Sequence, residues 1–271
     1  MLIKRILVVI ALLPIGMAII LYGKLPFVLA FVLIIGLAGW EYVIIMRKAG
    51  FHPAMILVPA AAALFVLMRG YDGFTSAPWL ISMFLLVSMT WHLVDYERGR
   101  DKAASDFNVT VGGALYLGWI GAYLVSLRNL PEGKWWFLVV LPAVWLADTG
   151  AYFIGSGFGK HKLSQRLSPK KSWEGYLAGV VCGTLGGALM AALCRLGAGP
   201  ASLINPWRGA LIGFVLAVLT PLGDLGESMF KRQAGVKDAS NIIPGHGGVF
   251  DRIDSWLWAG VIGYYLIVSF F

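Results

Sequence analysis

The sequence predicts an all-α membrane protein, a polytopic bundle of transmembrane helices, and three observations support this fold class. Hydrophobic residues make up 59% of the 271 residues and charged residues only 13%, whereas a soluble domain carries about 25% charged residues. The mean hydropathy is +0.77. The apolar residues gather in runs of membrane-spanning length, and the basic residues lie in the short segments between them. We therefore expect residues 1–271 to form a single transmembrane domain.

About nine apolar runs approach the roughly 20 residues that a helix needs to cross a bilayer. Two of them, 53–68 and 255–271, are short, so eight crossings are the alternative. The first run follows Lys4 and Arg5, as a signal peptide would, but eight further runs favour a first helix that is retained. The runs fall at about 6–22, 25–46, 53–68, 77–94, 109–127, 135–155, 174–195, 207–226 and 255–271.

The Lys and Arg residues are distributed unevenly among the segments between these runs, and the bias predicts an orientation. With a cytoplasmic N-terminus, 16 of the 22 Lys and Arg residues fall in cytoplasmic segments and six in outer segments. Cytoplasmic loops carry such an excess. We therefore expect a cytoplasmic N-terminus and an outer C-terminus, in the cell inner membrane or its equivalent. Because the net charge of +8 resides in these short loops, nucleic acid is not an expected partner.

Acidic residues inside apolar runs are costly, and each is a candidate for a functional role. Asp148 lies within the run 135–155 and has two open interpretations: a structural acid bonded to a neighbouring helix, or a ligand of a cation or substrate. Glu41 lies near the inner end of the second run, where we expect it to reach the surface or pair with Arg47 or Lys48. Seven of the 14 acidic residues follow residue 140: Asp148, Glu174, Asp224, Glu227, Asp238, Asp251 and Asp254.

The segment 159–175 is a basic loop that leads into a predicted helix. Ser172 is suited to cap that helix, and Glu174 suits its first turn. Lys170 and Lys171 stand just before the helix, where backbone N–H groups and positive charge favour phosphate. A loop that only sets the membrane topology would look similar, so both interpretations are open.

The helix after this loop carries glycine at every fourth position, at Gly175, Gly179 and Gly183. Such spacing lets two helices approach closely. We expect the stripe to pack within the bundle, with contact between the two copies of a homodimer as the alternative.

The most specific pattern is the stretch 221–256, in which two pairs of acidic residues flank a glycine-rich loop. Asp224 and Glu227 are three residues apart, as are Asp251 and Asp254, so each pair shares a face if its segment is helical. Carboxylate oxygens are suitable ligands for Mg²⁺, which commonly takes phosphate oxygens as its other partners.

The loop between these acidic pairs supplies positive charge and flexible backbone. Four basic residues could bind phosphates, and glycines let the backbone approach a ligand closely. Charge neutralisation by ion pairs alone would not explain so many charges beside glycines at a membrane boundary. The residues are Lys231, Arg232, Lys237 and Arg252, with Gly245, Gly247 and Gly248 around His246.

The stretch 228–254 resembles the signature of the phosphatidate cytidylyltransferase family, also called CDP-diacylglycerol synthases. Two upstream segments, Asp148-x-x-Ala-Tyr-Phe-x-Gly155 and Ser168-Pro-Lys-Lys-x-Trp-Glu-Gly175, resemble further family motifs. The resemblance covers the whole chain and its motifs are specific from residue 144 onward. The matching signature residues are Ser228, Phe230, Lys231, Arg232, Lys237, Asp238, Pro244, His246, Gly247, Gly248, Asp251, Arg252 and Asp254.

The resemblance implies that CTP and phosphatidic acid are converted to CDP-diacylglycerol and pyrophosphate at the cytoplasmic membrane face. It implies a scaffold in spans 1–130 and a catalytic part in 131–271, with CTP, phosphatidic acid and the bilayer as partners. The implied cofactor is Mg²⁺ together with a second cation, with Asp224, Asp251, Asp148 and Asp254 as metal ligands. The implied catalytic residues are Asp224, Asp251, Asp254, Lys231 and Arg232. The implied substrate-binding residues are Lys170, Lys171, Ser228, Lys237, His246, Gly247, Gly248 and Arg252.

Two other protein classes share some of these features. A secondary transporter would also bury acids in helices interrupted by glycine, but no inverted repeat is visible in the sequence. A CDP-alcohol phosphotransferase would also use clustered aspartates and Mg²⁺, but its Asp-Gly-x-x-Ala-Arg run is absent.

Overall fold

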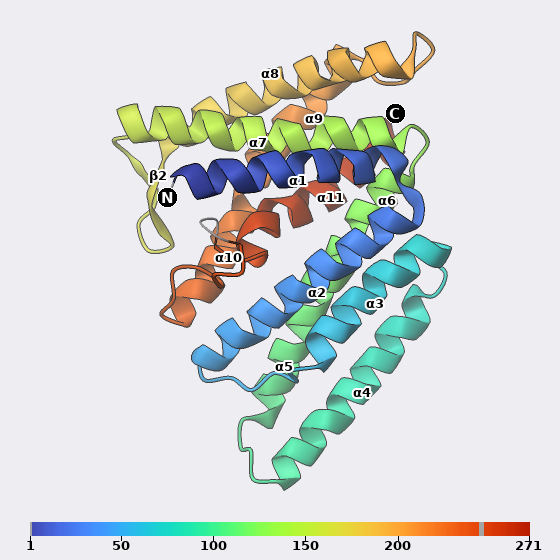
Figure 1. The fold of residues 1–271 in the computed structure, drawn as a ribbon. Helices are drawn as coiled ribbons and strands as arrows, with labels where there is room; N and C mark the ends of the chain where they lie inside the picture. The colour runs from blue at the N-terminus through green and yellow to red at the C-terminus, as the bar shows by residue number, and fades with distance from the viewer. Residues whose placement is uncertain (1, 244–246) are drawn as a thin grey trace. The chain divides into compact units, whose positions relative to one another are not determined.

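The computed structural model describes residues 2–243 and 247–271, with only the backbone described at 2–9, 11 and 12. The chain folds as a series of helices with one short two-stranded sheet (Figure 1). The elements are α1 (Leu2–Tyr22), α2 (Lys24–Lys48), α3 (Leu57–Asp72), α4 (Ala77–Glu97), α5 (Ala103–Ala114), the π-helical segment η1 (Leu115–Trp119), α6 (Tyr123–Asn129), α7 (Gly133–Phe158), β1 (Lys162–Ser164), β2 (Ser168–Ser172), α8 (Trp173–Ala198), α9 (Pro206–Leu219), α10 (Pro221–Gln233) and α11 (Phe250–Phe270).

The all-α membrane fold predicted from the sequence is confirmed by the length and apolar character of the helices. Among the described residues, seven helical segments are long and apolar enough to cross a bilayer, so the chain is a multi-pass membrane protein. They are Lys24–Lys48, Ala77–Glu97, Ala103–Asn129, Gly133–Phe158, Trp173–Ala198, Pro206–Gln233 and Phe250–Phe270.

The predicted runs 6–22 and 53–68 are not among these seven segments. The second of them corresponds to α3, whose 16 residues are fewer than the roughly 20 that a crossing helix needs. In α1 the described apolar part is only Leu13–Tyr22. The run 255–271, which looked short in the sequence, belongs to the 21-residue helix α11. Crossings beyond seven therefore stay a prediction.

The chain forms two compact units, and the last two helices contribute to both. Unit 1 consists of Met1–Ser126 and Phe230–Ile253, and unit 2 of Leu127–Met229 and Asp254–Phe271. The first boundary lies near the predicted division at residue 130, but the segment 230–253 belongs with unit 1. Which part is scaffold and which is catalytic stays a prediction.

In unit 1, helices α2 and α3 pack against each other, and η1 packs on α3. The approach is close because small residues lie at the contacts. A Cβ at Gly39 would lie 3.0 Å from the Cα of Pro59, and a Cβ at Gly118 would lie 2.5 Å from the Cα of Ala62. The apolar side chains of α2 and α3 that face these contacts form the core of the unit.

In unit 2, helix α8 packs against both α7 and α9, which also contact each other. The glycine stripe makes this arrangement sterically feasible. A Cβ at Gly175 would lie 2.7 Å from the carbonyl oxygen of Ala151 on α7, and a Cβ at Gly183 would lie 2.7 Å from the Cβ of Ala217 on α9. The expected packing of the stripe within the bundle is therefore confirmed.

The basic segment between α7 and α8 contains an antiparallel hairpin of β1 and β2, although the sequence suggested only a loop. Ser172 caps α8 as predicted, and its hydroxyl accepts a hydrogen bond from the Gly175 N–H at 3.2 Å. Glu174 lies in the first turn, as predicted, and its carboxylate contacts His161 Nδ1 at 2.6 Å. These contacts fix the hairpin, and with it Lys171, at the N-terminal end of α8.

Candidate active site

Unit 2 brings together three predicted aspartates and one lysine, which we name the acid cluster: Asp148, Asp224, Asp254 and Lys171. They come from α7, α10, α11 and β2, and their charges interact electrostatically with one another. The closest contact joins Lys171 Nζ to Asp224 Oδ2 at 2.6 Å. Four segments that are distant in sequence therefore place their charged groups at one location.

Close contact between α10 and α11 contributes to this arrangement. A Cβ at Gly223 would lie 2.6 Å from the carbonyl oxygen of Asp254, so the two helix backbones nearly touch beside Asp224. The Ser228 hydroxyl, one turn further along α10, lies 3.4 Å from Asp224 Oδ1 and donates a long hydrogen bond to it. Ser228 is thus placed beside the acid cluster, and its role in substrate binding stays a prediction.

The carboxylates of the acid cluster are accessible and retain unused hydrogen-bonding capacity. The Asp224 side chain is 37% exposed, Asp148 is exposed and Asp254 is half-buried. Asp254 accepts a hydrogen bond from the N–H of Ser255 at 2.6 Å. No residue within 2–243 and 247–271 donates a hydrogen bond to the Asp148 carboxylate. Asp148 and Asp254 can therefore accept a ligand without first losing a contact to another side chain.

The donor set of the acid cluster fits a divalent cation in its chemistry. Mg²⁺ is commonly held by one or two carboxylates, with substrate phosphates and water completing its octahedron. Across the described ranges, no three His, Cys, Asp or Glu side chains lie in a geometry that could hold a metal ion by themselves. Because Lys171 lies against Asp224, a cation at that carboxylate would have to displace the lysine. The arrangement suits a metal that arrives with a phosphate ligand.

Unit 1 holds the glycine-rich segment between α10 and α11, residues 234–249, which we name the signature loop. Asp251, at the start of α11, fastens the described part of this loop. Its Oδ2 accepts hydrogen bonds from the N–H groups of Ala239 at 2.9 Å and Gly248 at 2.8 Å. Its Oδ1 pairs with Lys231 Nζ at 2.6 Å, and both side chains are nearly buried. In this structure Asp251 and Lys231 therefore hold the loop to the ends of two helices.

Glu41 provides a second attachment for the signature loop, and this overturns the sequence-based expectation for that residue. Glu41 neither reaches the surface nor pairs with Arg47 or Lys48, because its side chain is fully buried. Its carboxylate accepts hydrogen bonds from the Ser240 hydroxyl at 2.5 Å and from the Val249 N–H at 3.0 Å.

A third hydrogen bond to Glu41 comes from the Phe250 N–H at 2.7 Å. Three donors compensate the cost of burying the carboxylate, which explains why it remains inside. Its presence in an apolar run was the only sequence signal for this role. Nothing local in the sequence indicates that its partners follow about two hundred residues later.

Two of the glycines of the signature loop, Gly247 and Gly248, are required by these attachments. Gly247 has φ of +83°, and a Cβ there would lie 2.8 Å from Asp251 Oδ2. A Cβ at Gly248 would lie 2.7 Å from both carboxylate oxygens of Glu41. The glycines thus let the loop backbone approach two buried carboxylates. The sequence had suggested that they let the backbone approach a ligand.

The remaining predicted site residues occupy varied surroundings. Lys170, Lys237 and Arg252 are exposed. Arg232 donates a hydrogen bond to the carbonyl oxygen of Val236 at 3.1 Å, and Glu227 is buried on α10. His246 lies outside the described residues, as do Pro244 and Gly245, so its predicted role stays a prediction.

Comparison with known proteins gives matches over nearly the whole chain. A model of the Cytidylyltransferase family matches residues 3–270. The phosphatidate cytidylyltransferase of Pseudomonas aeruginosa is 38% identical over 270 residues, which cover 94% of this chain and 93% of the relative. The proteins of the same name from a Synechocystis species and from Mycobacterium bovis are 30% and 31% identical. The matched regions cover 93% and 85% of this chain, and 91% and 76% of those relatives.

Proposed function

The chain belongs to the cytidylyltransferase family and is a nucleotidyltransferase, and we propose that it is the phosphatidate cytidylyltransferase of its cell. It joins CTP to phosphatidic acid and yields CDP-diacylglycerol and pyrophosphate. The observation that carries this proposal is the near full-length similarity to enzymes of that name. The acid cluster, placed on membrane-spanning helices beside Lys171, supports the same chemistry.

Residues of unit 2 would hold the cation that the family resemblance implies. Asp224 and Asp254 are the preferred ligands and Asp148 the third, because these carboxylates are accessible and only partly hydrogen-bonded. When bound, Mg²⁺ would neutralise charge on the triphosphate and on the departing pyrophosphate. We assign Asp251 to holding the signature loop in place, since its oxygens already accept hydrogen bonds from Lys231 and from the backbone of that loop.

Lys171 would then change partners when the nucleotide binds. In the structure its ammonium lies 2.6 Å from Asp224 Oδ2. A triphosphate offers oxygens of higher charge density, and a lysine on a flexible stem can move to them. The Ser228 hydroxyl, which lies beside the same carboxylate, would donate to a phosphate oxygen.

The chemical step needs no general base. A phosphate monoester has a second pKa near 6, so the phosphate of phosphatidic acid is largely deprotonated at pH 7. One of its oxygens forms a bond to the α-phosphorus of CTP. The bond to the bridging oxygen breaks, and pyrophosphate leaves with the electron pair. The protein aligns the reactants and stabilises charge, and the α-phosphorus inverts because no covalent nucleotidyl-enzyme forms.

We place this reaction at the cytoplasmic face of the inner membrane, because CTP is a cytoplasmic, highly charged substrate and the basic loops predict that side. A reporter fused after Phe271 should behave as external and one fused before Met1 as cytoplasmic. A cytoplasmic signal from the C-terminal fusion would contradict the orientation. Homodimer formation stays a proposal, and light scattering of the purified protein would test it.

The test of the function is pyrophosphate release by the purified full-length protein. Release should require both CTP and phosphatidic acid, and diacylglycerol should not replace the phosphatidic acid. CTP chiral at the α-phosphorus should give product of inverted configuration. Pyrophosphate exchange into CTP without lipid, or retention of configuration, would mean that a protein side chain attacks first and would contradict the single displacement. Absence of lipid-dependent release would contradict the function itself.

A further inference from the structure

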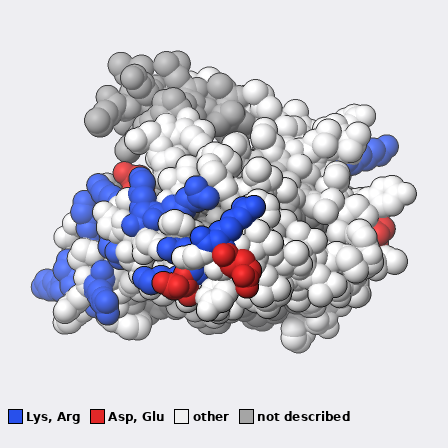
Figure 2. Space-filling model, turned by 90° about the horizontal axis from the view of Figure 1, so that it is seen from below, with Lys and Arg blue, Asp and Glu red and all other residues white. Residues whose placement is uncertain are grey.

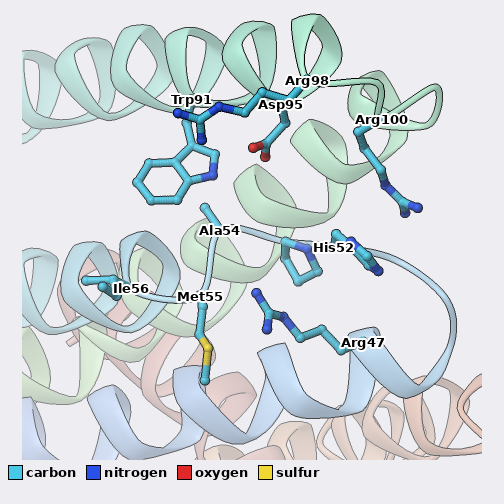
Figure 3. A pocket seen from close by; sticks show the side chains of 10 residues that line it. Arg47, His52, Ala54, Met55, Ile56, Trp91, Asp95, Arg98 and Arg100 are labelled. Atoms are coloured by element: carbon cyan, nitrogen blue, oxygen red, sulfur yellow. The ribbon is translucent and has the colours of Figure 1, made fainter.

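Unit 1 contains a pocket that none of the nucleotidyltransferase motifs explains. It has a volume of about 350 Å³ and lies where α2 and α4 end, against the extended segment 51–56 that leads to α3 (Figure 3). Its walls carry Arg47 from the end of α2, Arg98 and Arg100 from the segment after α4, and Trp91 and Asp95 from α4. The charged side chains that are visible in the view from below are mostly Lys and Arg (Figure 2).

Two of the three guanidinium groups are available to a ligand. Within residues 2–243 and 247–271, neither Arg47 nor Arg98 has an ion pair or a hydrogen bond from its side chain, and both are exposed. Figure 3 shows the Arg98 guanidinium beside the Trp91 ring and the Arg47 guanidinium reaching towards the segment that carries His52. With Asp95 as the one carboxylate lining the pocket, positive charge exceeds negative charge in its walls.

The third guanidinium is part of a rigid wall. Arg100 Nε contacts Asp106 Oδ2 at 2.7 Å, and Arg100 Nη2 donates to the carbonyl oxygen of Gly50 at 3.1 Å. The hydrogen bond from Arg100 to Asp106 raises the pKa of the guanidinium above its ordinary value. Asp106 is fully buried and also accepts the N–H of His52 at 2.7 Å. The backbone that forms the floor of the pocket is therefore held in place before any ligand arrives.

A further contact completes this wall. The Ala54 N–H donates to Thr110 Oγ1 at 3.0 Å, and Thr110 Oγ1 also contacts His92 Nε2 at 2.8 Å. A preorganised pocket loses little conformational entropy on binding, which favours a specific site over diffuse attraction of anions.

The rim of the pocket carries exposed apolar side chains. Ile56 is 69% exposed and Trp91 is 45% exposed. Tryptophan is enriched at the boundary between lipid and water, and the same face of α4 carries exposed Val87 and Val94, four residues before and three residues after Trp91. A ligand with a charged head and apolar tails would find both environments adjacent.

We propose that this pocket binds the headgroup of an anionic phospholipid, with the lipid phosphate held by Arg47 and Arg98. The planar guanidinium can donate two parallel hydrogen bonds to phosphate oxygens. Asp95 accepts a hydrogen bond from a headgroup hydroxyl, which makes phosphatidylglycerol the probe of choice. The acyl chains lie against Trp91, Ile56 and the exposed face of α4. All of the pocket residues belong to unit 1, and none belongs to the acid cluster.

The experiment measures phosphatidylglycerol that remains bound to the full-length protein, by native mass spectrometry in detergent. The test variant combines Arg47→Gln with Arg98→Gln. The matched control combines Lys48→Gln with Lys102→Gln, which removes the same charge from the same end of unit 1 at exposed residues outside the pocket. Lipid binding should fall roughly tenfold or more in the test variant and change less than about twofold in the control.

Three results would overturn the proposal: equal losses in both variants, which indicate diffuse attraction; no loss in either; or full displacement of the lipid by millimolar inorganic phosphate, which identifies the ligand as a soluble anion. Phosphatidylcholine should bind more weakly than phosphatidylglycerol to the unsubstituted protein. Thermal melting and size exclusion establish that the variants fold. If the double variant does not fold, Arg98→Lys replaces it as the test variant. This change keeps the charge but removes the bidentate hydrogen bonds to phosphate, so lipid binding should still weaken severalfold.

Discussion

The signature loop of unit 1 and the acid cluster of unit 2 both depend on carboxylates. The two sets differ in how many hydrogen bonds their carboxylates accept from the protein itself. Glu41 accepts three hydrogen bonds from the loop and its helix junction, and Asp251 accepts two from backbone and one from a lysine. Asp148 accepts none from the described residues, and Asp254 accepts one from its neighbour.

We propose that this difference separates carboxylates that organise the site from carboxylates that bind a ligand. A buried carboxylate must be compensated by donors, and once compensated it has little left to offer a cation. A carboxylate on a membrane-spanning helix costs free energy when it has few hydrogen-bond donors, and binding of a cation or another ligand would offset that cost. The comparison therefore predicts that loss of charge damages folding in unit 1 and chemistry in unit 2.

The largest effect on turnover should follow Asp224→Asn or Asp254→Asn. Either change keeps the shape but removes a charged ligand, so turnover should fall by roughly a hundredfold or more. Chelation of divalent cations should abolish turnover in the unsubstituted protein, and added Mg²⁺ should restore it. The melting temperature should stay within a few degrees, because Asp224 would lose one partly exposed ion pair and weaken one long hydrogen bond, and Asp254 would weaken a single hydrogen bond. Near-normal turnover at saturating Mg²⁺ would remove the residue from the proposed metal site.

Glu41→Gln should combine a loss of stability with a loss of turnover. The amide keeps one acceptor, but its NH₂ group would face the N–H of Val249 or Phe250. Breaking a buried, charge-assisted network of this kind costs about 2–4 kcal/mol, which thermal unfolding in detergent would detect. Glu97→Gln, at an exposed position at the end of α4, is the control and should have no effect. A stable but inactive Glu41→Gln protein would instead indicate a direct role in chemistry.

Gly248→Ala should displace the signature loop without removing any charge. The new methyl group would meet both Glu41 oxygens at 2.7 Å, so loop and helix must separate at a cost of about 1–3 kcal/mol. Turnover should fall several-fold with a lowered melting temperature. Gly112→Ala on α5 is the matched control, because a Cβ there has no neighbour within 4 Å. Equal behaviour of the two variants would show that the loop tolerates movement away from Glu41.

The two lysines of the basic hairpin should give unequal effects, and the smallest effect of all is expected at Lys170. Lys171 is paired with Asp224 in the acid cluster, whereas Lys170 is exposed. Lys171→Ala should therefore raise the KM for CTP or lower kcat by roughly tenfold, since a charge-assisted contact is worth about 1.5–3 kcal/mol. Lys170→Ala should change either constant by no more than a few-fold. Unchanged kinetics in both variants, with altered membrane orientation, would mean that the hairpin only sets topology.

The sequence by itself determined the membrane class, most of the helices, the Ser172 cap and the packing role of the glycine stripe. Each of these depends on residues that are close in the chain. Apolar runs determine spans, a hydroxyl three residues before an N–H determines a cap, and glycine at every fourth position determines a flat helix face. The motif resemblance also identified the chemistry, because the motif residues stand together in short segments.

Only the tertiary structure decided which carboxylates are compensated. Lys171 and Asp224 are more than fifty residues apart, and Glu41 meets Ser240 across 199 residues of sequence. No local pattern specifies such a pairing, since the choice of partner depends on how whole helices pack. The same limit hid the arginine pocket, where residues from three separate segments converge. Charge and spacing tell which groups are present, but their availability depends on the neighbours that the fold brings to them.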